Sequence, residues 1–402
     1  MATVTFYNLP AHGHINPTLP LVAELSGRGE QVIYYATDVF RHKIEKTGAT
    51  FRGYGDNYAF DPTANLGGPF GLMARSIEVT EAMLPALLEQ ARADRPDYLL
   101  VDSICVWGNY MRQLIGCPAV SVCSTFGVNW KVMSALSRSR GPKPPLRETL
   151  VGIPLVARYF AVARRIDRRF GTRRPGFTGF FTNRQALNLV FTSPGFQAHV
   201  DSFDSSYRFV GPAITERHET VDFPLDALGP EPIIYISMGT IFNDVASFYR
   251  ACFAAFADSG RTVVMSIGRN VDERALGTPP PNFLVRRYVP QLEILRRAAL
   301  FVTHGGMNSV NEALLYGVPM IVVPQVGDQY LVGNRVRELG AGLTVPTSDA
   351  TPARLRELAV RVLAEPLFRQ RCQEIGASLR EAGGHSRAAD EIWEWKREHG
   401  IA

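Results

Sequence analysis

The stretch Phe301-Val302-Thr303-His304-Gly305-Gly306-Met307-Asn308-Ser309-Val310-Asn311-Glu312 combines a strand, a glycine turn and the start of a helix. Its apolar run predicts a buried strand that ends at Thr303, and its polar residues predict a helix from Asn308 or Ser309 to Gly317. Paired glycines let backbone approach a ligand closely, and a helix start offers N–H donors at the positive end of the helix dipole. The stretch therefore predicts a binding site for a pyrophosphate group.

The acidic residue that closes this stretch extends the predicted site. Glu312 lies one helical turn beyond Asn308 on the same helix face. A carboxylate there can accept hydrogen bonds from both hydroxyls of a ribose next to the phosphates. Glycine and serine alone would favour an ordinary strand–turn–helix with a polar cap. The additional presence of His304 and Glu312 favours ligand binding.

Strand and helix signals alternate along both halves of the chain, as in parallel sheets covered on both faces. The predicted strands are residues 3–9, 31–36, 98–101 and 119–122 in the first half, and 233–236, 263–267, 283–288, 300–303, 320–323 and 343–345 in the second. We therefore expect an α/β protein with two doubly wound, Rossmann-like domains that face each other across a cleft. Ligands of such sheets bind at the carboxyl ends of the strands.

The predicted domain boundaries follow from the composition between these strands. We expect an N-terminal domain over residues 1–212 and a C-terminal domain over residues 233–384. Residues 213–232 contain Pro and Gly without an apolar period, which is typical of a linker. Ala388, Ile392 and Trp395 recur at helical spacing, so residues 385–402 are predicted to form a C-terminal helix that packs on the protein and can cross back over the cleft.

Composition limits the class of protein. The chain has 402 residues, of which 46% are hydrophobic and 20% charged, as in a globular protein of two or three domains. The five cysteines are odd in number and include no Cys-x-x-Cys pair, which argues against a disulfide framework or a zinc site. Residues 1–10 lack the features of a signal peptide, and no apolar run approaches the length of a membrane span. We therefore expect a cytoplasmic protein.

The positive charge is concentrated in one segment. The net charge is +5, but residues 138–174 carry +9 and the remainder −4, so nucleic acid is not the expected partner. The apolar residues of this segment recur at near-helical spacing and predict a basic amphipathic helix; they are Leu155, Tyr159, Val162, Ile166 and Phe170. A solvated face is the favoured interpretation, and contact with a membrane surface or attraction of an acidic ligand remain alternatives.

A second polar stretch, Pro10-Ala11-His12-Gly13-His14-Ile15-Asn16-Pro17, follows the first strand. Asn16 fits a helix cap and Pro17 a first helical position, so we expect a helix from there to about Gly29, with the histidines in the preceding loop. Histidine can remove a proton from a hydroxyl near neutral pH, and a buried carboxylate can hold its tautomer. Asp102 follows the strand at 98–101 and could reach this loop. Alone, His14 could cap the helix, and Asp102 could bind backbone N–H groups.

Several motifs together resemble a known family. The stretch 303–317, then Val318-Pro319-Met320 and Pro324-Gln325-Val326-Gly327-Asp328-Gln329, resembles the donor-binding motif of UDP-dependent glycosyltransferases. Tyr288-Val289-Pro290-Gln291 is similar to the start of that motif, and Ile236-Ser237-Met238-Gly239-Thr240 to a phosphate loop. Over nearly its whole length the chain is similar to the bacterial macrolide glycosyltransferase family, which has the GT-B fold. Members of this family glycosylate macrolides, flavonoids and other small aglycones.

The resemblance implies roles for particular residues. The residues that would surround the donor are Ser237, Gly239, Thr240, Tyr288, Val289, Gln291, His304, Gly306, Asn308, Ser309, Glu312, Asp328 and Gln329. Among them, His304, Asn308, Ser309 and Thr240 would hold the diphosphate, Glu312 the ribose and Gln291 the uracil side. Asp328 and Gln329 would bind the hydroxyls of the sugar. Tyr288, where plant members carry Trp, would stack on the base.

The resemblance also implies the reaction. His14 would be the base, with Asp102 as its partner, in a single displacement that inverts the anomeric centre. The sequence contains no Asp-x-Asp pair, so neither a metal nor another cofactor is expected beyond a UDP-sugar, with glucose favoured. The helix dipole and His304 would neutralise the diphosphate. The N-terminal domain would bind the acceptor, and the C-terminal domain the nucleotide sugar.

The acceptor is expected to be a hydrophobic small molecule, such as a macrolide, flavonoid or phenolic natural product, in antibiotic biosynthesis or resistance. Aromatic residues that could line its pocket are Tyr58, Phe60, Phe70, Phe126 and Trp130, although helix-spaced apolar residues are more often core. Three alternatives stay open: a UDP-sugar epimerase, a lipid glycosyltransferase and a non-catalytic ligand-binding protein. The sequence is compatible with a monomer or a homodimer.

Overall fold

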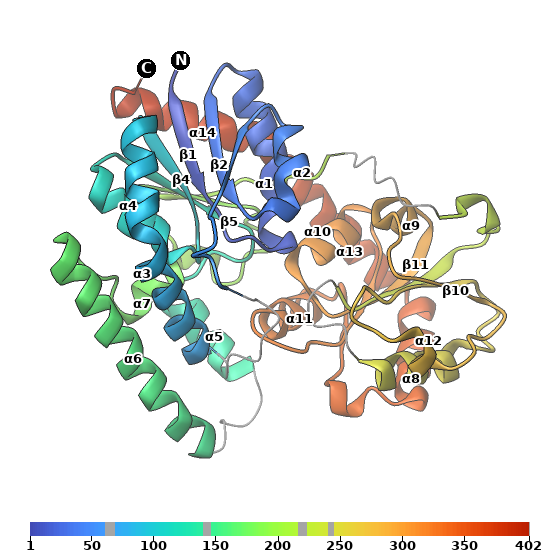
Figure 1. Cartoon of the computed structure of the whole chain (residues 1–402). Coiled ribbons are helices and arrows are strands. Elements are labelled where there is room, and N and C mark those ends of the chain that lie inside the picture. Colours follow the sequence, from blue (N-terminus) through green and yellow to red (C-terminus); the bar gives the residue numbers. More distant parts are fainter. Residues whose placement is uncertain (61–68, 140–145, 216–222, 240–244, 402) are drawn as a thin grey trace. The chain divides into compact units, whose positions relative to one another are not determined.

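The computed structural model describes residues 1–60, 69–139, 146–215, 223–239 and 245–401 (Figure 1). The chain divides into two compact units. The first unit contains Met1–Ile214 together with Ala382–Ala402, and the second contains Thr215–Glu381. Each unit is built around its own parallel sheet, as the alternating strand and helix signals predict.

The sheet of the first unit has seven strands in the order β3-β2-β1-β4-β5-β6-β7, and all of its pairs are parallel. The strands are β1 (Thr3–Tyr7), β2 (Gln31–Ala36), β3 (Thr50–Gly53), β4 (Tyr98–Asp102), β5 (Ala119–Cys123), β6 (Leu187–Val190) and β7 (Tyr207–Phe209). This order places β1 beside β4 and β4 beside β5. The residues that follow these three strands therefore meet at one edge of the sheet.

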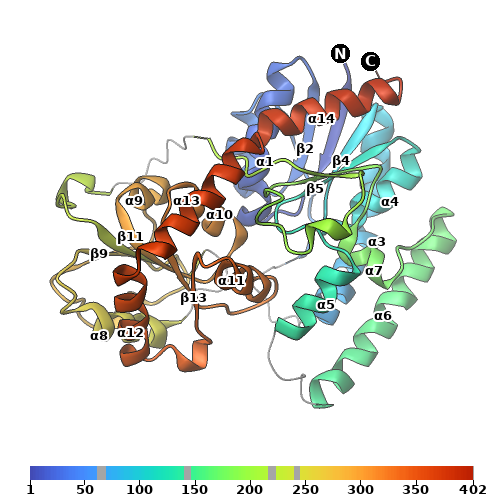
Figure 2. The same ribbon diagram turned by 180° about the vertical axis from the view of Figure 1, so that it is seen from behind.

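Helices cover both faces of this first sheet (Figures 1 and 2). They are α1 (His12–Gly27), α2 (Arg41–Glu45), α3 (Pro69–Asp94), α4 (Val106–Ile115), α5 (Trp130–Ser139), α6 (Leu146–Phe170), α7 (Phe177–Thr182) and α14 (Gly384–Glu398). On one face, α1 and α14 share a buried core with the strands, to which α14 contributes Ala388, Ile392 and Trp395. On the other face, Gly108 of α4 lies against Val101 of β4, and α4 packs on α3.

The sheet of the second unit has six parallel strands in the order β10-β9-β8-β11-β12-β13. The strands are β8 (Ile233–Ser237), β9 (Val263–Ser266), β10 (Phe283–Arg286), β11 (Ala298–Thr303), β12 (Met320–Val322) and β13 (Gly342–Thr344). The helices are α8 (Ala246–Phe256), α9 (Gln291–Arg297), α10 (Met307–Leu315), α11 (Gln329–Glu338), α12 (Pro352–Ala364) and α13 (Pro366–Glu381). Short 3-10 turns occupy Asp38–Phe40, Val200–Ser202, Leu225–Ala227, Glu273–Leu276 and Thr347–Asp349.

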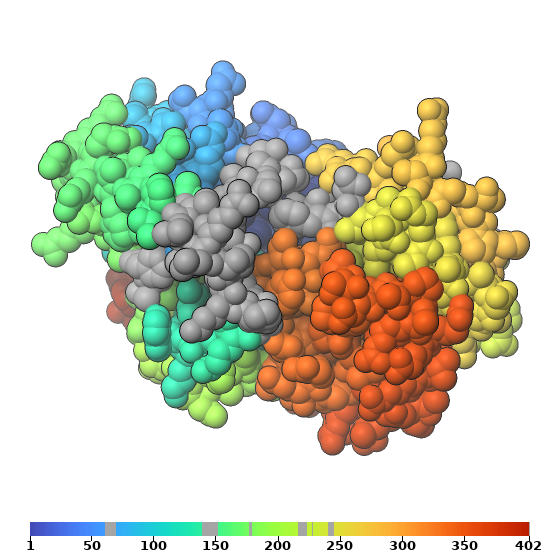
Figure 3. Space-filling view, turned by 90° about the horizontal axis from the view of Figure 1, so that it is seen from below, coloured from blue at the N-terminus to red at the C-terminus, as the bar shows by residue number. Residues whose placement is uncertain are grey.

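The predicted basic amphipathic helix is α6. Tyr159, Val162 and Ile166 are buried on its inner side, which packs along α3. Arginines occupy the outer side, where Arg158 and Arg165 form ion pairs with glutamates of α3. The space-filling view shows the side chains of α6 in green on the surface of the first unit (Figure 3). None of the helices in the described parts of the chain is both long enough and apolar enough to cross a bilayer.

Candidate active site

His14 lies on a helix and not in the predicted loop. The predicted helix start at Asn16 and Pro17 is wrong, because α1 begins at His12 and contains Pro17 within it. The backbone N–H groups of His14 and Ile15 both donate to the carbonyl of Ala11, at 2.9 Å each. The helix therefore extends beyond Pro17 toward the N-terminus. Proline lacks its own N–H group but does not prevent residues before it from bonding in this way. The first turn of α1 therefore fixes the backbone of His14.

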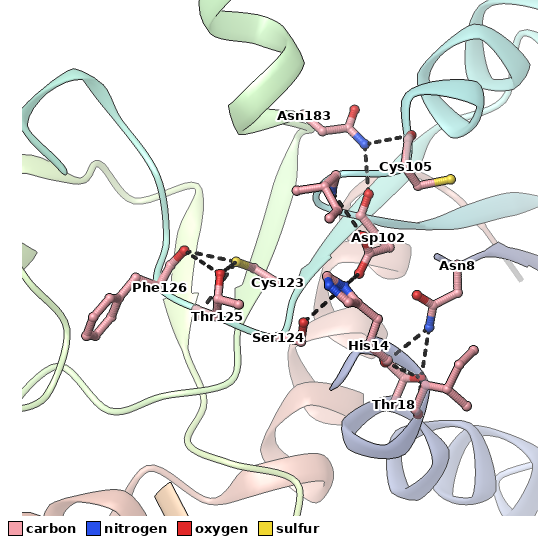
Figure 4. Close-up of polar contacts among 12 residues, drawn as sticks. Asn8, His14, Thr18, Asp102, Cys105, Cys123, Ser124, Thr125, Phe126 and Asn183 are labelled. Carbon is pink, nitrogen blue, oxygen red and sulfur yellow. Dashed lines mark hydrogen bonds and ion pairs between the residues drawn. The ribbon is translucent and has the colours of Figure 1, made fainter. Parts of the chain in front are cut away.

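His14 forms a close contact with a buried carboxylate (Figure 4). Its Nδ1 atom is 2.7 Å from Oδ2 of Asp102, whose side chain is fully buried, whereas 15% of the His14 side chain is exposed. Asp102 is the last residue of β4, and β4 pairs with β1, which leads into α1. The adjacency of these two strands thus brings together residues that are 88 positions apart in the chain.

The second oxygen of Asp102 has a different partner. Oδ1 accepts a hydrogen bond from the backbone N–H of Ile104 at 3.0 Å. Asp102 therefore binds a backbone N–H group, as the structural interpretation of this residue predicts, and also contacts His14. Two distinct hydrogen bonds hold the carboxylate plane in one orientation. Because Oδ2 accepts from Nδ1–H, this arrangement favours the tautomer in which Nε2 is the basic nitrogen of His14.

Ser124 was missing from the sequence-based prediction. Its Oγ atom is 3.2 Å from Nδ1 of His14, and the residue directly follows β5 (Figure 4). A signal for it existed, because a polar residue at the end of a strand next to β4 meets the same edge of the sheet as Asp102. The hydroxyl therefore contributes a second contact to the imidazole.

The predicted acceptor residues fall in different surroundings. Tyr58 stacks on Tyr54 with ring centroids 5.2 Å apart and also contacts Phe60. Phe126 is buried beside Phe196, as a core residue is, whereas Trp130 is 72% exposed. The fifth residue, Phe70, lies against Gly152 of α6. Their role in acceptor binding stays a prediction. Residues 61–68, which connect Phe60 to α3, lie outside the described residues.

In the second unit, the predicted phosphate-binding stretch has two glycines packed against an imidazole. A Cβ atom on Gly239 would lie 2.7 Å from the ring of His304, and one on Gly306 would lie 2.5 Å from its Nε2 atom. Gly306 is the N-cap of α10, which begins at Met307, one residue before the predicted start at Asn308. The absence of side chains at both glycines therefore makes room for the His304 ring at the beginning of this helix. Thr240, the predicted partner of this loop, lies outside the described residues.

The surroundings of His304 change its expected electrostatic role. Burial lowers the pKa of His304 to about 4, although a hydrogen bond with the backbone of Ser237 acts in the opposite direction. The imidazole is therefore neutral at pH 7 in the ligand-free protein. Its role in neutralising a bound diphosphate stays a prediction. A neutral imidazole can still donate one hydrogen bond, and the helix dipole of α10 remains a source of positive potential.

Glu312, the predicted ligand of the ribose, is contacted by Gln291, which the resemblance places on the uracil side of the donor. Gln291 donates through Nε2 to Oε2 of Glu312 at 2.6 Å and lies 3.3 Å from Oγ of Ser309. Its carbonyl oxygen accepts from the hydroxyl of Tyr235 at 2.9 Å. Glu312 is 1% exposed, and Tyr235 is stacked on Phe301 in the core. Gln291 thus orients the carboxylate, and Tyr235, which no motif indicated, orients Gln291.

The remaining predicted donor residues lie around the strand ends of the same sheet. Tyr288 is 47% exposed, while Val289 is buried. Oε1 of Gln329 accepts from the backbone N–H groups of Gln325 and Val326, so this side chain also shapes the loop before α11. Ser237 ends β8, Asp328 is the N-cap of α11, and Asn308 lies in the first turn of α10.

Comparison with solved structures defines the class of protein. The calicheamicin glycosyltransferase CalG4 matches with a TM-score of 0.80 and 28% identity, covering 98% of both chains. The glycosyltransferase of kitacinnamycin matches with a TM-score of 0.80 and 29% identity, again covering 98% of both. Two parallel Rossmann-like sheets with these neighbours define a glycosyltransferase of the GT-B fold.

Sequence relatives give the family. The chain is 34% identical over 399 residues to a UDP-glucosyltransferase of Bacillus subtilis, YojK, covering 98% of this chain and 97% of the relative. It is 33% identical to the oleandomycin glycosyltransferase of Streptomyces antibioticus, covering 97% and 90%. Residues 251–382 match the model of the erythromycin biosynthesis protein CIII-like C-terminal domain. The chain belongs to the macrolide and natural-product glycosyltransferase family.

Proposed function

We propose that this enzyme transfers a hexose, glucose in the first instance, from a UDP-sugar to a hydroxyl of a hydrophobic natural product. Relatives named as a UDP-glucosyltransferase and as an oleandomycin glycosyltransferase support the donor and the acceptor class. The observation that carries the proposal is the 2.7 Å contact between Nδ1 of His14 and the buried carboxylate of Asp102. A protein that only binds a ligand has no need of such a pair.

The proposed reaction is one displacement. Nε2 of His14 takes the proton of the acceptor hydroxyl while the acceptor oxygen forms a bond to the anomeric carbon. The bond from that carbon to the UDP oxygen breaks, and UDP leaves with the electron pair. Asp102 stabilises the imidazolium that forms. Attack from the face opposite the leaving group inverts the anomeric centre.

The donor is proposed to bind at the carboxyl ends of the second sheet. The start of α10 and the neutral imidazole of His304 would contact the diphosphate, and Glu312, oriented by Gln291, would contact the ribose. Tyr288 would stack on the base, and Asp328 with Gln329 would bind the sugar. No metal is proposed, because hydrogen-bond donors and a helix dipole can stabilise a leaving diphosphate.

The test is transfer activity with UDP-glucose and a hydrophobic phenol, followed by liquid chromatography and mass spectrometry. His14→Ala should lower kcat by about two to four powers of ten, the usual contribution of a general base, and leave the Kd for UDP nearly unchanged. A β-linked product from an α-linked donor would support inversion, and undiminished activity in EDTA would support metal independence. Turnover of His14→Ala at the wild-type rate would refute the assignment of His14 as the base. Conversion of the UDP-sugar without acceptor would favour an epimerase.

A further inference from the structure

Asn183 has a backbone conformation that its surroundings must stabilise. It is the C-cap of α7 with φ 34° and ψ 43°, in the left-handed region, and it is 3% exposed. Asparagine tolerates this region better than most residues with a side chain, but such a conformation persists only where local contacts favour it. The contacts of its side-chain amide supply the reason.

The amide nitrogen of Asn183 binds the backbone beside the proposed catalytic carboxylate (Figure 4). Nδ2 donates to the carbonyl oxygen of Asp102 at 3.0 Å and to that of Cys105 at 3.3 Å. These two carbonyls flank the turn between β4 and α4. The amide therefore holds the backbone from which the Asp102 side chain extends toward His14.

The amide oxygen of Asn183 continues the network away from Asp102. Oδ1 accepts from Nδ2 of Asn109 and from Nε2 of Gln185, at 3.1 Å each. Oδ1 of Asn109 accepts in turn from Gln113, one turn further along α4. Gln113 exchanges two hydrogen bonds with the backbone of Arg173, just beyond α6. Gln113, Asn109 and Asn183 thus form an amide chain from the end of α6 to the backbone carbonyl of Asp102.

We propose that Asn183 is a positioning residue for glycosyl transfer, which fixes the carboxylate of Asp102 against Nδ1 of His14 through the amide chain. The inference rests on the proposed function of these two residues. Its physical basis is the sensitivity of catalysis to geometry, since a displacement of about 1 Å can lower a rate about 100-fold. The backbone carbonyl of Asp102 accepts from Asn183, and its carboxylate oxygen Oδ1 accepts from the backbone N–H of Ile104.

A purely structural role makes a different prediction. Buried amides are normally hydrogen-bonded, so the loss of any one of them lowers stability. That loss alone does not alter the proton affinity of His14. A displaced Asp102 does alter it, because the carboxylate stabilises the imidazolium. The pH dependence of turnover therefore separates the two roles.

The principal variant is Asn183→Gly, because glycine adopts a left-handed conformation without strain while the side chain with its amide is removed. We expect kcat to fall about 10- to 100-fold, with both KM values within about twofold of wild type. We also expect the midpoint of the rising limb of kcat/KM against pH to move to lower pH. Asp102→Asn should move it in the same direction.

Asn282→Ala provides the matched control. Nδ2 of Asn282 also donates to two backbone carbonyls, those of Phe256 and Arg261, at 2.9 Å each, but in the second unit and before β10. It should lose thermal stability to a similar extent and keep the wild-type kcat and pH profile. If Asn183→Gly behaves as this control does, or as wild type does, the inference is overturned.

A second variant covers failure of Asn183→Gly to fold. Asn109→Ala removes the next link of the amide chain and leaves the left-handed residue in place. It should lower kcat about three- to tenfold with a pH shift of the same sign, and an unaltered profile would overturn the inference. His14→Ala is assayed in parallel. If that variant turns over normally, the proposed function fails, whereas an inactive His14→Ala with a wild-type Asn183→Gly refutes the inference alone.

Discussion

At the scale of single residues, the environment of a side chain decides its chemistry more than its identity does. His14 and His304 both follow a strand end, but they meet opposite surroundings. A buried carboxylate contacts Nδ1 of His14, whereas burial lowers the pKa of His304 to about 4. The first environment suits a base and the second a neutral hydrogen-bond donor. The family resemblance assigned the base to His14 and diphosphate binding to His304, but the sequence did not indicate that the His304 ring is neutral in the ligand-free protein.

A neutral His304 can be replaced by an amide. His304→Gln should keep the Kd for UDP within about fivefold of wild type, since one neutral hydrogen bond contributes about 1 kcal/mol and glutamine can supply it. His304→Ala should weaken UDP binding about tenfold or more. Isothermal titration calorimetry at pH 7.5 measures both values. Equal losses in the two variants would indicate that a positive charge is required.

At the scale of elements, strand length does not separate the predicted strands from the missed ones, because β12 and β13 have three residues each and were predicted. All ten predicted strands are present, and their ends differ by a few residues. The three missed strands are β3, β6 and β7, with four, four and three residues. All three residues of β7 are half-buried at the edge of the sheet, so no apolar run marks that strand.

The candidate site was predictable where one motif contains the chemistry. Asp102 ends a strand, and His14 and the stretch from His304 to Glu312 follow strand ends, which the alternation of elements locates. The contacts of Ser124 and Asn183 depend on segments far apart in the chain. The spacing of residues within one motif does not predict contacts between such distant segments. The contact of Gln291 with Glu312 likewise joins two helices, α9 and α10.

The start of α10 allows a test of how the helix holds its imidazole. Gly306 has φ −63°, so alanine is compatible with its backbone, but the new Cβ would lie 2.5 Å from Nε2 of His304. Gly306→Ala should therefore displace the ring and weaken UDP binding about tenfold, with little change in Tm. On a His304→Ala background, Gly306→Ala should weaken UDP binding little further, because both substitutions remove the same contact between the His304 ring and UDP.

The control for this prediction is Gly229→Ala in the same unit. A Cβ there would meet nothing within 4 Å, so UDP affinity should stay at the wild-type value. Calorimetry on the four proteins of the cycle gives the coupling between the two positions. Fully additive losses at Gly306 and His304 would contradict the proposed displacement of the ring.

At the scale of the whole molecule, the C-terminal helix belongs to the unit in which the chain begins. Lys396 of α14 and Glu30 form an ion pair in which both side chains are almost fully buried. Tyr98 donates a second hydrogen bond to the same carboxylate at 3.1 Å. At the surface, Arg28 of the first unit pairs with Asp390 at 2.6 Å. The last helix therefore completes the first unit.

Loss of the buried cation should destabilise the first unit strongly. Lys396→Met leaves Glu30 buried without its ammonium partner, and such a change typically costs about 3–5 kcal/mol. Urea unfolding followed by tryptophan fluorescence measures the transition. Adding Glu30→Gln should restore part of the loss. Arg361→Met breaks an exposed pair with Glu365 and should cost less than about 1 kcal/mol, and an equally small loss for Lys396→Met would contradict the role of the pair.

The two places where the chain passes between the units have a consequence for protein engineering. The backbone N–H of Gly384 donates to the carbonyl of Val210 at 2.5 Å, so the segment that leaves the first unit and the one that returns to it are neighbours. The second unit is thus an insertion whose two attachment points coincide. A short splice from Gly211 to Gly384 would excise residues 212–383 and leave the first sheet with its closing helix as one continuous chain. The same two junctions would accept the corresponding lobe of another family member.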